Sequence, residues 1–151
     1  MTQIHHAGLT VSSLERALAF WSDALGMQVV MQQDRQGGYF ERIVGEHAVD
    51  VRIAQVAFGG EGPRIELFEF RSPRGGHAAL RTADVGFSHV CVTCDDIDAL
   101  LPRLLAAGGE AVSEPVAVDS GANAGGRAVY VRDPDGHVLE LFTPPRARAH
   151  F

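Results

Sequence analysis

The stretch HAGLTVSSLERALAFWSDALGMQVV, residues 6–30, decides the fold because a second version of it follows later in the chain. Residues 89–113, HVCVTCDDIDALLPRLLAAGGEAVS, align with it at an offset of 83 residues. His6 then falls on His89, and the same offset matches further polar, apolar and glycine positions: Thr10 with Thr93, Leu14 with Ile97, Leu18 with Leu101, Trp21 with Leu104, Ala24 with Ala107, Gly26 with Gly109 and Val29 with Val112. Self-similarity at a fixed offset indicates a structural repeat.

The ends of the two copies match as well. Ile65-Glu66-Leu67-Phe68 corresponds to Leu139-Glu140-Leu141-Phe142 at an offset of 74 residues, so the second copy is nine residues shorter between its helix and its last strand. We therefore interpret the chain as a duplicated unit.

Each copy predicts the element order β-α-β-β-β. In the first copy, residues 4–11 alternate as a strand does, and Ser12 or Ser13 can cap the helix that follows. Apolar residues at Leu14, Leu18, Trp21 and Leu25 give that helix one buried face, and Gly26 ends it. Three strands complete the copy, at residues 29–33, 51–58 and 64–70.

The second copy repeats this order with a strand over 89–94 and a helix over 97–107. Pro102 lies inside that helix and is expected to kink or weaken it, because proline lacks the amide hydrogen. Strands are expected at 111–118, 128–132 and 138–142, and Asp133-Pro134-Asp135-Gly136 predicts a turn between the last two. The fold class is therefore α+β, with modules at 1–73 and 86–146, a linker at 74–85 and a tail at 147–151.

Composition limits the partners. Of the 151 residues 46% are hydrophobic, and 13 basic against 19 acidic residues give a net charge of −6. That balance argues against nucleic acid and against an anionic membrane surface, since both require clustered basic residues. The chain holds neither a long apolar run nor a signal-peptide pattern, and its two cysteines are expected to be reduced thiols. We expect a cytoplasmic protein.

Strand alternation brings four polar residues to one side of the repeat. His6 and His89 lie on the faces of their strands opposite to the aliphatic residues, and Glu66 and Glu140 do the same in the last strands. Any one of them alone is more often a surface group. The same His–Glu arrangement at matching places in both copies instead favours a metal site, because two imidazoles and two carboxylates suit Ni, Co, Zn, Fe or Mn.

Four segments resemble the vicinal oxygen chelate superfamily, which includes glyoxalase I, extradiol dioxygenases, methylmalonyl-CoA epimerase and bleomycin-resistance proteins. They are HHAGLTVSSLERALAFWSDALGMQVV, RIELFEF, FSHVCVTCDDIDALLPRLLAAGG and YVRDPDGHVLELFTPP. The resemblance implies two β-α-β-β-β modules forming a curved mixed sheet, a cup around a divalent metal. Its metal ligands would be His6, Glu66, His89 and Glu140.

That ligand set is similar to the set of bacterial glyoxalase I, a lyase or isomerase in which a metal-bound glutamate moves a proton. The resemblance makes Glu140 the expected base, although Glu66 is equally placed. An epimerase is less expected, because the position of its additional carboxylate falls on Ile53. Extradiol dioxygenases use three ligands, so Glu66 would be surplus. A metal-free binding or antibiotic self-resistance protein is the remaining alternative, although such members generally lack all four ligands.

The substrate contacts are expected in two glycine-rich segments, 34–40 and 119–127, which resemble mobile lids. Candidates for substrate contact are polar residues of these segments and phenylalanines on the ligand-bearing strand faces: Arg35, Tyr39, Phe68, Asn123, Arg127 and Phe142. Members of the superfamily often dimerise, so a homodimer is expected, in which a site is formed within one chain or completed by its partner.

Overall fold

The computed structural model describes residues 2–59 and 62–145. The chain divides into two compact units. The boundary between them lies between Ala78 and Ala79, inside the segment 74–85 expected as a linker. The predicted tail 147–151 lies outside the described residues, as do residues 60–61.

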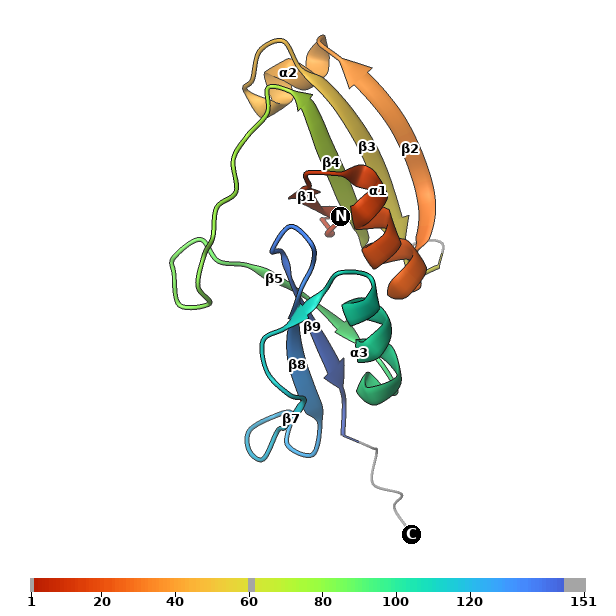
Figure 1. Ribbon diagram of the computed structural model, residues 1–151, viewed down its shortest axis with the longest axis vertical. Helices are drawn as coiled ribbons and strands as arrows, with labels where there is room; N and C mark the ends of the chain where they lie inside the picture. The colour runs from red at the N-terminus through yellow and green to blue at the C-terminus, as the bar shows by residue number, and fades with distance from the viewer. Residues whose placement is uncertain (1, 60–61, 146–151) are drawn as a thin grey trace. The chain divides into compact units, whose positions relative to one another are not determined.

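The first unit contains one mixed sheet with the strand order β1-β4-β3-β2 (Figure 1). Strand β1 is parallel to β4, and the other neighbours are antiparallel. Its elements are β1 (His6–Thr10), α1 (Leu14–Leu18), the π-helix η1 (Ala19–Ala24), β2 (Gln28–Gln36), α2 (Tyr39–Val44), β3 (Asp50–Ala57) and β4 (Arg64–Ser72).

The second unit repeats this topology, which confirms the duplicated α+β fold. Its sheet has the order β5-β9-β8-β6, with β7 also pairing with β8, and β5 is parallel to β9. Its elements are β5 (His89–Thr93), α3 (Ile97–Ala106), β6 (Glu110–Ala111), β7 (Val116–Ala117), β8 (Arg127–Arg132) and β9 (Val138–Thr143).

The first predicted helix is present but changes its winding half-way. Ser13 caps α1 by accepting a hydrogen bond from the amide of Arg16, as expected for one of the two serine candidates. From Ala19 the chain follows a π-helix, in which the amide of Leu25 donates to the carbonyl of Phe20 at 2.9 Å. In this wider turn the adjacent Phe20 and Trp21 are both fully buried, with ring centroids 5.6 Å apart.

Helix α3 runs continuously through Pro102, whose effect on the stability of the helix stays a prediction. Two expectations about the second unit need correction. The strand expected over 111–118 is divided into β6 and β7, because Pro115 between them has no amide hydrogen for the ladder. The expected loop 119–127 ends one residue earlier, since Arg127 already belongs to β8.

The segment 34–40 is also not the loop that the glycines indicated. Asp34 to Gln36 complete β2, and Tyr39 and Phe40 begin helix α2. Gly37 and Gly38 make the sharp turn between them, with φ of 57° and 73°, a region that other residues rarely adopt. Phe40 is buried, which fixes α2 to the sheet.

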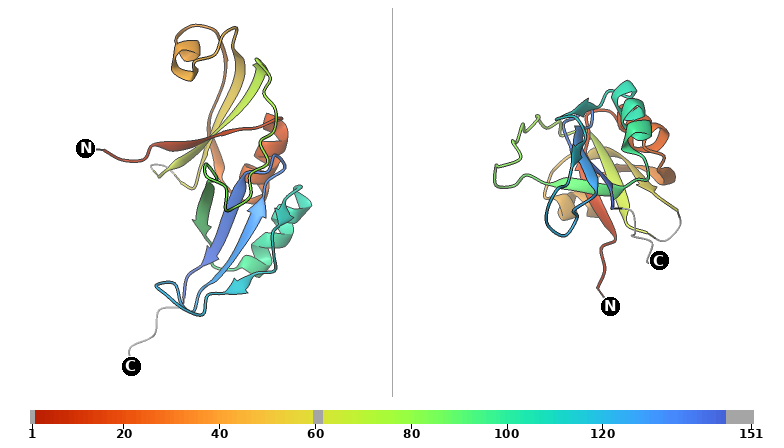
Figure 2. Two further views of the ribbon diagram at one scale, coloured as in Figure 1. Left: turned by 90° about the vertical axis from the view of Figure 1, so that its left-hand side faces the viewer. Right: turned by 90° about the horizontal axis from the view of Figure 1, so that it is seen from below.

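The sheet of the first unit has a helix on each face (Figure 2, left). On one face, Ile65 and Leu67 are buried beside α1, as the alternation predicted. On the other face, Phe40 of α2 packs with Val51 and Ile53, and partly buried side chains complete this cluster: Met31, Phe68 and Phe70. Glu66 alternates with Ile65 and Leu67 in β4 and therefore lies on the same face as this second cluster.

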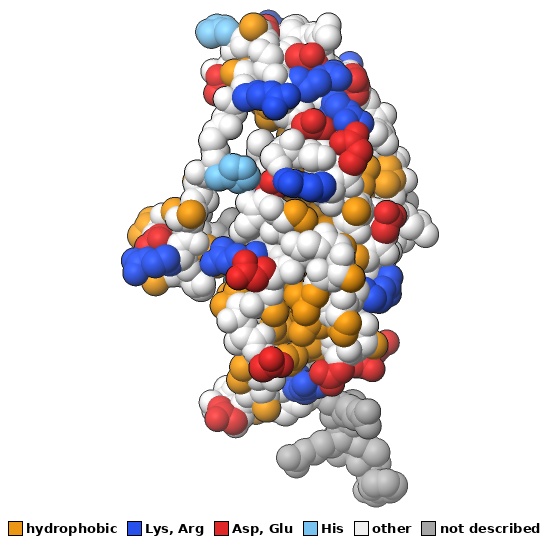
Figure 3. Space-filling view, in the orientation of Figure 1, with side chains coloured by type: hydrophobic (Ala, Val, Ile, Leu, Met, Phe, Trp, Pro, Cys, Tyr) orange, Lys and Arg blue, Asp and Glu red, His pale blue; other side chains and the backbone are white. Residues whose placement is uncertain are grey.

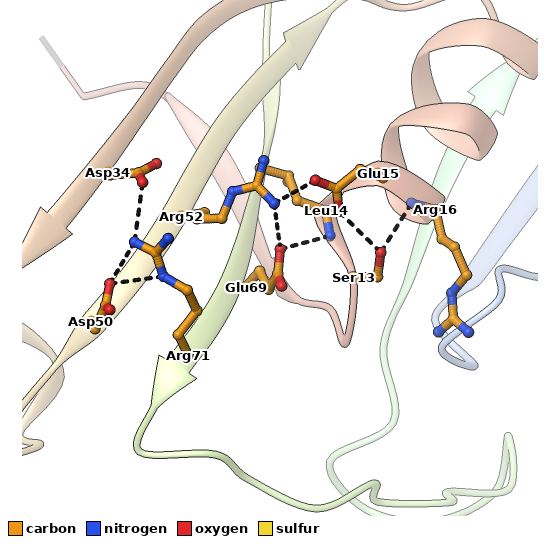
Figure 4. A network of polar contacts seen from close by, with 9 residues as sticks. All are labelled: Ser13, Leu14, Glu15, Arg16, Asp34, Asp50, Arg52, Glu69 and Arg71. Carbon is orange, nitrogen blue, oxygen red and sulfur yellow. Dashed lines mark hydrogen bonds and ion pairs between the residues drawn. The ribbon is translucent and has the colours of Figure 1, made fainter.

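Ion pairs anchor α1 to the sheet on the first face (Figure 4). The Glu69 carboxylate accepts a hydrogen bond from the amide of Leu14 at 3.0 Å and from Arg52 at 3.2 Å. Arg52 also donates to Glu15. The first amide of the helix, which has no partner within the helix, thus receives a charged acceptor from β4.

Further ion pairs tie together strands and helices at the surface. Arg71 donates to Asp34 and Asp50, and Arg127 pairs with Asp98 of α3. Figure 3 shows acidic and basic side chains close to one another on the face drawn. Within the described residues, every helix is too short or too polar to cross a membrane.

Candidate metal centre

The first unit brings His6 and Glu66 into direct contact. Strands β1 and β4 are parallel neighbours in which His6 pairs with Arg64 and Gly8 with Glu66. The imidazole Nε2 of His6 lies 3.1 Å from Oε2 of Glu66. The side chain of Glu66 is 13% exposed, and that of His6 is 38% exposed, so the pair is open to solvent on the imidazole side.

The second unit reproduces the same contact. His89 in β5 pairs with Val138, and Cys91 pairs with Glu140 in the parallel neighbour β9. The Nε2 atom of His89 lies 3.1 Å from Oε2 of Glu140. The repeat thus supplies one imidazole–carboxylate pair per unit, at matching register positions and with the same separation.

The chemistry and spacing of each pair fit a shared cation. Two donor atoms that each lie about 2.1 Å from one ion, roughly at right angles, are about 3 Å apart. The two pairs, at 3.1 Å, have this spacing, which is also that of an ordinary hydrogen bond. Across residues 2–59 and 62–145, no group of three or more His, Cys, Asp or Glu side chains is gathered as a cation site, so each pair by itself offers two donor groups.

The carboxylate of Glu66 has a second partner, Gln55 in β3. The amide Nε2 of Gln55 donates to Oε1 of Glu66 at 2.7 Å, and Arg64 donates to Oε1 of Gln55 at 2.9 Å. Gln55 is 7% exposed. Both oxygens of Glu66 are therefore engaged, one by the imidazole and the other by a buried amide.

The other ring nitrogen of His6 meets His5. The two Nδ1 atoms are 2.8 Å apart, so one ring donates and the other accepts. His5 is exposed and precedes β1, which begins at His6. If Nε2 of His6 binds a metal, its Nδ1–H donates to His5, a type of contact that fixes the orientation of ligating histidines. An open cavity of about 660 Å³ borders this contact, lined by Gln3, Ile4, His5, Gly62, Pro63 and Arg64.

The surroundings of Glu140 are different. Tyr130 takes the cross-strand position opposite Glu140, and its ring lies 5.1 Å from the ring of His89. The pKa of Tyr130 is raised mainly by desolvation on burial, and to a smaller extent by the negative charge of Glu140. Desolvation, together with the charge of Glu140 and a hydrogen bond to it, raises the pKa of the Cys91 thiol to about 11. Cys91 and Tyr130 are thus neutral neighbours of Glu140 at neutral pH.

Three of the expected substrate contacts belong to the first unit. Phe68 lies on the face of Glu66, where its ring approaches Gly8 and packs with Phe40 and Phe70. The guanidinium of Arg35 donates to Gln33 at 2.7 Å and lies over the ring of Tyr39. Arg35 and Tyr39 are thus joined to each other at the α2 end of the sheet.

The other three belong to the second unit: two lie on opposite faces of its sheet and one lies in a turn. Phe142 alternates with Leu141 in β9 and lies on the face of Glu140. Arg127 lies with Val129 and Val131 on the opposite face, where it pairs with Asp98, so the structure does not bring it to His89 and Glu140. Asn123 lies in an exposed turn and accepts a hydrogen bond from the amide of Gly126.

Sequence reasoning missed the residues that surround the two glutamates. Of these residues, Gln55 has the clearest signal in the sequence, because it is the only polar residue in the apolar run Ile53–Phe58. Its burial requires hydrogen-bond partners, and only the register of β3 against β4 identifies Glu66 as one of them.

The sequence of this chain matches a known protein family. Residues 3–141 match the model of the Glyoxalase/Bleomycin resistance protein/Dioxygenase superfamily. The chain belongs to this superfamily. The glyoxalase superfamily match spans both units and includes all four residues of the two pairs.

Individual members of the superfamily share about a third or less of their residues with this chain. A 2-epi-5-epi-valiolone epimerase from Actinomyces sp. is 32% identical over 146 residues, covering 94% of this chain and 79% of the epimerase. A probable lactoylglutathione lyase from Vibrio parahaemolyticus is 28% identical, covering 97% of this chain and 94% of the relative. The crystal structure of a glyoxalase family protein from Bacillus cereus superposes with a TM-score of 0.84 at 26% identity, covering 96% of this chain and 95% of that one.

Proposed function

We propose that this protein is a divalent-metal-dependent enzyme that moves a proton at a carbon next to a carbonyl or hydroxyl group. The observation that carries the proposal is the repeated imidazole–carboxylate contact, at 3.1 Å in both units. His6, Glu66, His89 and Glu140 together would hold one cation, of Ni, Co, Zn, Fe or Mn, as expected for an N2O2 donor set.

The chemical roles divide between the cation and the protein. When bound by these residues, a divalent cation would supply a Lewis acid that lowers the pKa of a substrate C–H group next to an oxygen atom. The carboxylate of Glu140 accepts that proton and returns it. Phe68 and Phe142, on the same strand faces as Glu66 and Glu140, form apolar surface beside the reacting atoms, which disfavours water there.

A lyase or isomerase reaction of the glyoxalase I type is the first candidate. The similarity to a probable lactoylglutathione lyase along 97% of the chain supports it, as does the presence of both carboxylates. Its substrate would be a thiohemiacetal formed by a thiol and a 2-oxoaldehyde. Both this reaction and an epimerisation begin when a base removes a proton from carbon, and an epimerisation then requires the proton to return to the opposite face.

An epimerase is the second candidate, because the relative with 32% identity carries that name. A polyhydroxylated cyclic ketone such as 2-epi-5-epi-valiolone carries adjacent oxygen atoms that could bind the cation together. The two candidates therefore share the metal and the base that removes the proton. They differ in where the proton is returned and in the groups that bind the rest of the substrate.

The proposal is tested by metal analysis of the purified protein, followed by turnover assays. We expect tightly held transition metal that is lost in His6→Ala. Metal-loaded protein should convert a glutathione–methylglyoxal thiohemiacetal, or exchange the α-proton of the cyclic ketone in D2O. Catechols and 2-substituted acyl-CoAs test the dioxygenase and acyl-CoA epimerase alternatives with the same preparations.

One result would replace the proposal with a binding function. A protein that holds no metal under any of these conditions, yet binds an aromatic or hydrophobic ligand, would be a small-molecule binding or self-resistance protein. We also propose that the chain is a homodimer, which size-exclusion chromatography with light scattering measures directly.

A further inference from the structure

Gln55 is a buried polar side chain with a defined orientation. Among the described residues it is one of two buried side chains that are polar or charged, the other being Asp133. The guanidinium of Arg64 has only donors, so the group of Gln55 that faces it at 2.9 Å must be the amide oxygen. The amide NH2 therefore points to Glu66, where it lies 2.7 Å from Oε1.

This contact restricts the carboxylate that it reaches. Gln55 and Glu66 are direct cross-strand partners, so the backbone of β3 and β4 holds both ends of the hydrogen bond in register. Oε1 is occupied by the amide, while Oε2 faces Nε2 of His6 at 3.1 Å. Rotation of the carboxylate away from His6 would break the amide hydrogen bond and leave a buried donor without its acceptor, which is costly.

The repeat provides an internal comparison in the second unit. The residue in the place of Gln55, directly opposite Glu140, is Tyr130. Its ring packs against His89, and it has no amide to donate. The parallel neighbour of Glu140 is Cys91, whose thiol is a weak donor, where Glu66 has Gly8. The two glutamates therefore have the same imidazole partner but different support.

We propose that Gln55, oriented by Arg64, is a positioning residue that keeps Glu66 a fixed metal ligand and leaves Glu140 as the glutamate that moves. This inference rests on the proposed function, because it assumes that both pairs bind a cation. It gives Glu66 and Glu140 different roles, although the set of four proposed ligands does not distinguish between them.

The test uses Gln55→Leu, with Tyr130→Phe as the matched control in the other unit. Each full-length variant is loaded with Co2+, and its affinity for Co2+ and the visible absorption of the bound ion are recorded. We expect Gln55→Leu to weaken Co2+ binding about 10- to 100-fold, as the loss of a ligand's hydrogen-bonding partner does elsewhere, and to change the spectrum. Tyr130→Phe should leave the spectrum unchanged.

Arg64→Met is the second variant, because Gln55→Leu can disturb folding. It keeps Gln55 in place but removes the group that orients its amide, so it should shift the Co2+ spectrum in the same direction to a smaller extent. Urea unfolding of both variants without metal separates this effect from lost stability.

The outcomes separate this inference from the proposed function. If the unaltered protein binds no Co2+, both fail together. If it binds Co2+ and the Gln55→Leu and Arg64→Met variants keep its affinity and spectrum, the proposed function stands and the role of Gln55 is refuted. Equal spectral changes in Tyr130→Phe would refute the difference between the two glutamates.

Discussion

Replacing Glu69 with alanine should destabilise the first unit without affecting metal binding. Glu69 lies three residues after Glu66 in β4 but on the opposite face, where it contacts the amide of Leu14 and the guanidinium of Arg52. Its side chain is 17% exposed, so these contacts are only partly hydrated. The substitution tests whether Glu69 serves stability alone, while Glu66 on the other face of β4 serves metal binding.

The magnitude follows from the two contacts. A hydrogen bond to a charged group contributes roughly 1.5–3 kcal/mol, and in the variant the freed amide at the helix start can recover part of this through water. Arg52 retains Glu15 as a partner. We therefore expect the free energy of unfolding to fall by about 2–3 kcal/mol.

The assay is urea unfolding followed by circular dichroism, together with Co2+ titration of each variant. Glu15→Ala is the matched control: it removes the other carboxylate of Arg52, but Glu15 is exposed, so the loss should be much smaller. Glu66→Ala should instead abolish tight Co2+ binding. The reasoning fails if Glu69→Ala is as stable as the unaltered protein, or if it weakens Co2+ binding as much as Glu66→Ala does.

Three further results are expected. Glu140→Gln should keep metal binding near normal and lower turnover roughly 10²–10⁴-fold in steady-state assays, because the amide cannot accept the proton; unchanged turnover would remove Glu140 as the base. Pro102→Ala should raise the free energy of unfolding by about 1–3 kcal/mol in urea, since it restores a main-chain donor inside α3, and a loss of stability would contradict this. In metal-free protein at pH 7.5, the Cys91 thiol should react with iodoacetamide about 100-fold more slowly than a free cysteine, because its pKa is raised to about 11 and little thiolate forms below that pH. Glu140→Gln removes the negative charge beside Cys91 and should therefore speed this alkylation; equal rates would show that the carboxylate does not influence the thiol.

The repeat made most of the fold predictable. The spacing of Leu14, Trp21 and Leu25 defines the buried face of the first helix, and that of Ile97 and Leu104 defines the buried face of the second. The structure buries all five residues. Strand alternation correctly placed Glu66 on the face opposite to α1 and Glu140 on the face opposite to α3, because the side-chain period of a strand is fixed by its backbone.

The errors occurred where tertiary contacts decide the local structure. Gly37 and Gly38 indicate a turn, but only the burial of Phe40 shows that a helix follows it. The switch to a π-helix after Leu18 has no signal in a pattern read at 3.6 residues per turn. Gln55 could be recognised as an unusual polar residue in an apolar strand, whereas its partner depends on strand register, which the sequence does not specify.

The most direct test of the account is the amount of metal that each chain binds. Protein saturated with Ni2+, Co2+ or Zn2+, freed of excess ion and analysed by plasma mass spectrometry should contain one ion per chain. His6→Ala and His89→Ala should each lose it, because both imidazoles serve the same cation. Two ions per chain, or an ion that survives either substitution, would show that the two His–Glu pairs act separately and would contradict the account.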